Sequence, residues 1–196
     1  NITSAYGVGT SIEDIDIEVN TITISNSAGN VYLDEIDNLA INTIIALDQD
    51  VYLNVNGNIT DISSTETANI ASNSLNITSA YGVGTSIEDI DIEVTTLNIN
   101  NTTSGDIVIE EKDSLTLGTI TQNNGNLVVS NIIDSITQNG NINVGGGFVS
   151  IHSADDFVQN GNITLSTQSK TVDVYAASNI TMSSSSITST NEGNVK

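Results

Sequence analysis

The fold of this chain is decided by a nine-residue stretch, DSITQNGNI at Asp134–Ile142, which recurs 21 residues later as DDFVQNGNI at Asp155–Ile163. A third, slightly expanded version, ITQNNGNL, lies at Ile120–Leu127. Each version joins a short apolar segment to a turn carrying Gly-Asn and then to the next apolar segment. Gly and Asn tolerate positive φ, which suits a turn. The spacing predicts a strand–turn–strand unit of roughly 20 residues that repeats along the chain.

A longer repeat encloses the shorter one. The run NITSAYGVGTSIEDIDIEV occupies Asn1–Val19 and recurs without a change at Asn76–Val94. After one inserted residue the similarity continues, since Gly29–Leu33 matches Gly105–Ile109. We therefore interpret residues 1–196 as one solenoid segment, with a long repeat at 1–75 and 76–151 that contains the shorter units. Both ends of the chain fall within repeats, which predicts a piece of a longer protein.

Hydrophobic alternation and composition indicate strands throughout. In Ile15–Val19 and in Val51–Val55 the apolar side chains share one face and the polar side chains the other. Ile, Val and Thr are abundant and Pro is absent, which suits a stack in which nearly every backbone N–H donates to its neighbour. Ile15, Ile17, Val19, Ile136 and Phe157 are expected to point inward.

A repeat of this size cannot bury its own apolar face, so successive repeats must stack. Stacking at about 4.8 Å pairs every backbone group with the turns above and below. We predict an all-β protein, a right-handed parallel β-helix (a β-solenoid) of about ten rungs. The alternative is a tandem of immunoglobulin-like sandwiches. The sandwich is disfavoured because its strands differ from one another, whereas the short repeat keeps one pattern.

Charge limits the classes of partner. The chain has 24 Asp and Glu against 3 Lys and Arg, a net charge of −21. Nucleic-acid binding needs a basic surface, and anionic membrane surfaces also attract basic segments. No apolar stretch approaches the ~20 residues of a membrane helix. We therefore expect neither a nucleic-acid partner nor membrane insertion.

The duplicated segment carries the candidate site residues. They are two groups of carboxylates, expected as Ca²⁺ ligands: Asp14, Asp16 and Glu18, and then Asp89, Asp91 and Glu93. On a strand, side chains two residues apart are separated by about 7 Å, too far to share one ion comfortably. Carboxylates on adjacent rungs, about 4.8 Å apart, are close enough, with turn carbonyls completing an oxygen shell. The alternative is a solvated acidic face that maintains solubility.

Catalysis has little support in the sequence. His152 is the single His, it has no identifiable nucleophile beside it, and no Arg is present to serve as a base. We expect no enzyme and no catalytic residues. The Asn-Ile-Thr triplets at Asn58, Asn76 and Asn162 instead predict outward Asn side chains that form amide ladders along the stack.

The repeats also resemble a known family. GNITL at Gly161–Leu165 and GDIVIEEKDSLTLGTITQNNGNLVVS at Gly105–Ser130 are similar to the repeat regions of filamentous-haemagglutinin-like adhesins. Those are giant bacterial exoproteins, many of them secreted by the two-partner route, and autotransporter passenger regions look much the same. The resemblance implies a right-handed β-helix, an extracellular or bacterial cell-surface location, and a role in adhesion or matrix building.

The functional hypothesis is a stiff extracellular fibre or surface adhesin segment. Its expected partners are sister rods, through self-association into filaments, or host, cell-surface or matrix ligands such as glycans. The alternative hypothesis is a polysaccharide-binding or polysaccharide-degrading β-helix domain, since such domains use paired carboxylates and acids are plentiful here.

Overall fold

The structure of the chain is a computed structural model that describes residues 1–63 and 65–196. Within these residues all regular structure is β-strand. No helix in this part of the chain is long and apolar enough to cross a membrane. The strands are β1 (Ile2–Ser4), β2 (Ile15–Ile17), β3 (Thr21–Asn26), β4 (Val31–Glu35), β5 (Leu39–Val55), β6 (Ile59–Asp61), β7 (Ile70–Ser79), β8 (Ile90–Asn101), β9 (Ile107–Glu111), β10 (Leu115–Gln122), β11 (Leu127–Asn131), β12 (Ile136–Gln138), β13 (Ile142–Val144), β14 (Val149–Ser153), β15 (Phe157–Gln159), β16 (Ile163–Gln168), β17 (Val172–Ala176), β18 (Ile180–Met182) and β19 (Thr188–Asn191).

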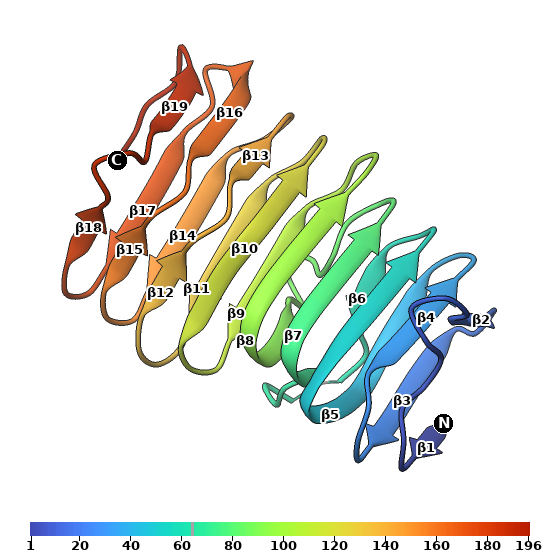
Figure 1. The fold of residues 1–196 in the computed structure, drawn as a ribbon. Coiled ribbons are helices and arrows are strands. Elements are labelled where there is room, and N and C mark those ends of the chain that lie inside the picture. The colour runs from blue at the N-terminus through green and yellow to red at the C-terminus, as the bar shows by residue number, and fades with distance from the viewer. Residues whose placement is uncertain (64) are drawn as a thin grey trace.

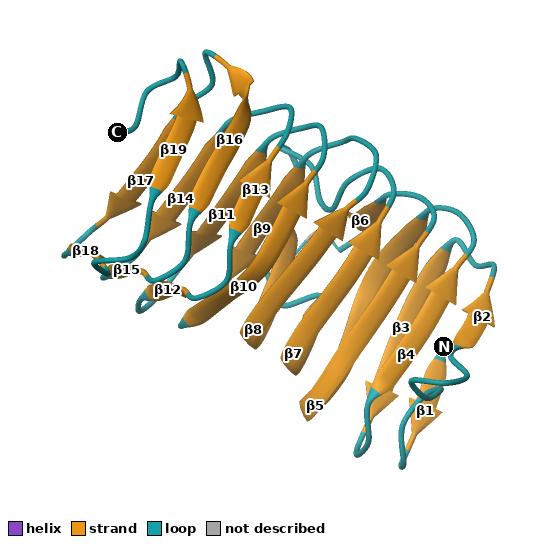
Figure 2. Cartoon of the chain, turned by 45° about the horizontal axis from the view of Figure 1, so that its top comes forward, coloured by secondary structure: helices purple, strands orange, loops and turns teal. Residues whose placement is uncertain are grey.

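The chain winds as a coil whose turns stack along one axis (Figures 1 and 2). Each turn pairs with the next in parallel, as in β4 with β5 and β7 with β8. The coil has about nine turns, close to the ten expected. Equivalent positions recur once a turn in the column Val8, Val31, Val51, Leu75, Leu97, Leu117, Gln138, Gln159 and Met182. The predicted parallel β-solenoid is thus confirmed, and a hairpin-built sandwich is excluded.

A single apolar column fills the coil from end to end. Its best example is a ladder in which six residues are fully buried, from Leu39 and Ile59 through Val83, Ile107 and Leu127 to Val149. Ile136 and Phe157 pair in register and are 0% and 1% exposed, as predicted. Stacking therefore lets one short apolar pattern supply a continuous core.

The first turn departs from the expected burial. Ile15 and Val19 were expected inside, but they are 39% and 36% exposed, while Ile17 is partly buried against the core. The reason is that β2 pairs with β4 on one side only. In the second copy of the same sequence, β8 lies between β7 and β9, and Ile90 and Val94 are buried.

The two copies of the duplicated segment lie on different sides of the coil. We call the ladder Leu33, Leu53, Ile77, Ile99 and Ile120 side A, and the ladder Ile2, Ile24, Ile44, Ile70 and Ile92 side B. Ile2 of the first copy lies on side B, where successive turns pair it with Ile24, Ile44 and Ile70. Ile77, the equivalent residue of the second copy, lies on side A instead. The copies are therefore not offset by a whole number of turns, and identical sequences meet different neighbours.

Candidate functional site

The acids of the first copy lie on the first turn, on side A, and are exposed. Asp16 stands in register with Asp34 of the next turn, so carboxylates on adjacent turns do come side by side. The Asp34 carboxylate already has a hydrogen-bond partner, since its Oδ2 accepts from Asn54 Nδ2 at 2.7 Å. Glu18 and Asp16 border a shallow hollow with Asp34. No group of three carboxylates forms around Asp14 or Asp16 within the described residues.

The acids of the second copy converge with a third carboxylate. Asp89, Asp91 and Glu66 each bring one oxygen to within 4.8 Å of the others. We call these three residues the acidic triad. The separation of about 7 Å expected for acids two positions apart on a strand does not apply to Asp89 and Asp91, because Asp89 precedes β8. Glu66 lies in the β6–β7 connection, outside the matched stretches of both repeats, so the repeats give no signal for it.

Buried Asn69 holds the triad in place. Its backbone N–H donates to the Asp91 carbonyl at 2.8 Å, and its Oδ1 accepts from the Asp91 N–H at 2.9 Å. Its Nδ2 donates to Asp61 Oδ1 at 2.7 Å, which ties the start of the β6–β7 connection to the same point. Because Ile90 and Ile92 point into the core, the Asp91 side chain points outward. It is nevertheless only 7% exposed.

A cavity of roughly 310 Å³ surrounds Asp91. The β6–β7 connection contributes Glu66 and Thr67 to its wall, and the next turn contributes Glu110, which stands in register with Asp91. Burial, and then repulsion from Asp89 and Glu66, raise the pKa of Asp91 to about 7. Burial and then repulsion from Glu66 raise the pKa of Asp89, and burial and then repulsion from Asp89 and Glu66 raise that of Glu110. The site thus brings several carboxylates together around one buried member, Asp91.

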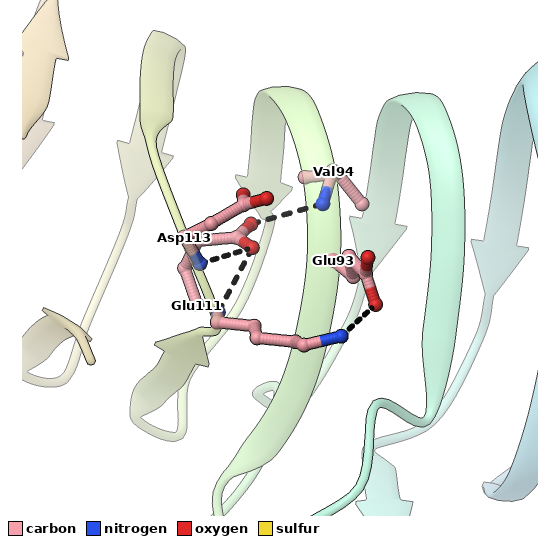
Figure 3. A network of polar contacts seen from close by, with 5 residues as sticks. Glu93, Val94, Glu111 and Asp113 are labelled. Carbon is pink, nitrogen blue, oxygen red and sulfur yellow. Dashed lines mark hydrogen bonds and ion pairs between the residues drawn. The ribbon is translucent and has the colours of Figure 1, made fainter. Parts of the chain in front are cut away.

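The last predicted ligand, Glu93, borders the same cavity but is not one of the three grouped carboxylates. Its Oε2 accepts from Lys112 Nζ at 2.7 Å in an exposed ion pair, shown in Figure 3. Beside it, the buried carboxylate of Glu111 accepts from the backbone N–H groups of Val94, Lys112 and Asp113. Glu111 therefore fastens one turn to the next.

Side A carries a second feature, a groove of roughly 490 Å³. The rings of Tyr32 and Tyr52 stack there with centroids 4.6 Å apart and an interplanar angle of 4°. Beyond them, Asn98 Nδ2 donates to Asn76 Oδ1 at 3.1 Å on the adjacent turn, which is one step of the predicted amide ladder. Asp14 lies at the same groove. This surface combines aromatic edges with a row of amides.

Fold and surface together define the class of the chain as an acidic parallel β-solenoid with a carboxylate-lined cavity on side B and an amide-lined groove on side A. In comparisons with protein-family models, curated proteins and solved structures, the chain matches none.

Proposed function

We propose that the chain is a stiff rod segment of an extracellular or bacterial cell-surface fibre or adhesin. The observation that carries the proposal is the unbroken in-register ladder from Leu39 to Val195, which joins nearly the whole coil through one core. At the strand spacing of about 4.8 Å, nine turns span roughly 40 Å. A rod of this kind supplies length and a repeated outer surface, and many weak equivalent contacts along it sum to avidity.

Negative-stain microscopy and sedimentation velocity over a concentration series test this proposal. We expect straight rods of constant width, and filaments where the rods associate. Ile136→Lys puts a charge into the fully buried core column and should abolish the rods. Ile133→Lys is the matched control, because it adds the same charge at a side chain that is 55% exposed, in the β11–β12 connection. Absence of rods from the parent chain, or equal effects of both variants, would count against the proposal.

Polysaccharide binding is the second candidate, and the side A groove favours it. Sugars bind to proteins through contacts with aromatic rings and hydrogen bonds to amides, and Tyr52, Asn76 and Asn98 supply both kinds of group. Affinity electrophoresis in gels containing acidic or neutral glycans tests it. We expect retardation that Asn76→Ala weakens, whereas Asn160→Ala, which alters the Asn139–Asn160 amide pair outside the groove, leaves it unchanged. A reducing-sugar assay on the same glycans tests the degrading alternative.

A further inference from the structure

We infer that the acidic triad of Glu66, Asp89 and Asp91 is a Ca²⁺ site, which fastens the β6–β7 connection to the turn that begins at β8. The triad draws on two separate parts of the chain. Glu66 comes from the connection, and Asp89 and Asp91 come from the start of β8. An ion held by all three would bridge turns that otherwise meet here through Asn69.

The donor set suits Ca²⁺ better than Mg²⁺. The triad offers three carboxylates within 4.8 Å of one another, from two separate parts of the chain. Ca²⁺ takes six to eight oxygen ligands in flexible geometry, so such an irregular set can bind it while water in the cavity completes its shell. Mg²⁺ demands near-ideal octahedral geometry, keeps several of its water molecules and is usually bound through only one or two carboxylates.

The burial of Asp91 distinguishes this cluster from an ordinary acidic surface. It is 7% exposed, and no hydrogen-bond donor among the described residues meets its carboxylate. The carboxylate opens into the cavity with no counter-ion beside it, so a cation bound there, or a proton, would stabilise it. Lys112 also borders the cavity, but it is paired with Glu93.

The duplicated sequence supplies a matched control within the same molecule. Asp16 occupies the position of Asp91 in the first copy, with 19 identical residues from Asn1 to Val19 and from Asn76 to Val94. Asp16 is exposed, and no third carboxylate joins it within the described residues. Asp91→Asn and Asp16→Asn remove the same charge from the same local sequence, so both change non-specific cation binding equally.

Isothermal titration of Ca²⁺ into the chelator-treated 196-residue chain, paired with thermal unfolding, tests the inference. We expect one site above a background of weak surface binding, and a rise in Tm of roughly 5–10 °C when Ca²⁺ is a hundredfold above the Kd. Asp16→Asn should retain both effects, and Asp91→Asn should lose both. Mg²⁺ at the same concentration should give a smaller rise.

Glu66→Gln provides an independent variant, because Glu66 is exposed and its replacement does not disturb the core. It should unfold like the parent chain without Ca²⁺ and lose the Ca²⁺-dependent rise in Tm. The inference is overturned if the parent chain binds no Ca²⁺ at millimolar concentration. It is equally overturned if Glu66→Gln keeps the full rise, or if Asp16→Asn and Asp91→Asn respond alike.

Discussion

Glu111 Oε2 accepts a hydrogen bond from the backbone N–H of Val94 at 3.0 Å, and Glu35 Oε2 accepts one from Val19 in the same way, also at 3.0 Å. Both glutamates are fully buried. Val19 and Val94 end the two identical segments, so each copy is closed by a carboxylate from the following turn. The contact gives each of these backbone donors a carboxylate acceptor from the next turn.

Replacing Glu111 tests how much this contact stabilises the coil. An amide nitrogen has no lone pair to offer, so Glu111→Gln leaves at least one backbone N–H without an acceptor. We expect a loss of about 1–3 kcal/mol in the free energy of unfolding at pH 5, measured by urea denaturation. Glu110→Gln is the control, since it removes a charge that Asp89 and Glu66 repel, and it should be neutral or stabilising. A neutral Glu111→Gln would contradict the argument.

Glu111 should also make stability depend on pH. Burial raises its pKa from the ordinary 4.5 to about 8, against the lowering effect of its backbone donors. The folded state therefore binds the proton more tightly than the unfolded state does. The stabilisation from this group is complete below about pH 4.5 and is lost as pH rises through about 8. The difference in unfolding free energy between the parent chain and Glu111→Gln should shrink from pH 5 to pH 8.5, and a constant or growing difference would contradict it.

The two phenylalanines of the chain should differ in their contribution to stability. Phe157 is 1% exposed in the column between Ile136 and Ile180, whereas Phe148 is 39% exposed. Phe157→Ala removes a large side chain from a site with little room to collapse, and we expect it to cost about 3–5 kcal/mol. Phe148→Ala should cost less than half as much. Denaturant midpoints at a fixed m-value give both numbers, and equal costs would argue against the stacked column.

The duplicated segment allows the same substitution to be compared in two environments. Ile90 is fully buried and Ile15 is 39% exposed, although their flanking sequences are identical. We expect Ile90→Ala to cost about 2–5 kcal/mol and Ile15→Ala to cost much less, because a cavity forms only where neighbours surround the side chain. Thermal unfolding followed by circular dichroism measures both. Similar losses would mean that local sequence outweighs stacking.

The repeats in the sequence made the fold predictable, but the part of the site that lies outside the matched repeats could not be predicted. Ile136 and Phe157 could be placed in one column because the spacing of the short repeat equals one turn of the coil. Asp89 and Asp91 could be named as candidate Ca²⁺ ligands because acids recur in the duplicated segment. Glu66 could not, because it belongs to a connection that occurs once. The burial of Glu111 was also hidden, since an acid in an alternating strand is expected to point outward.

The sequence by itself determined that successive turns stack in parallel, because short apolar repeats with Gly-Asn turns can bury their inner faces only against one another. Only the tertiary structure decided which copy of the duplicated segment is enclosed and which acids meet. Because the long repeat is not a whole number of turns of the coil, its second copy begins on a different side from the first. There the β6–β7 connection covers Asp91, while its counterpart Asp16 remains in solvent.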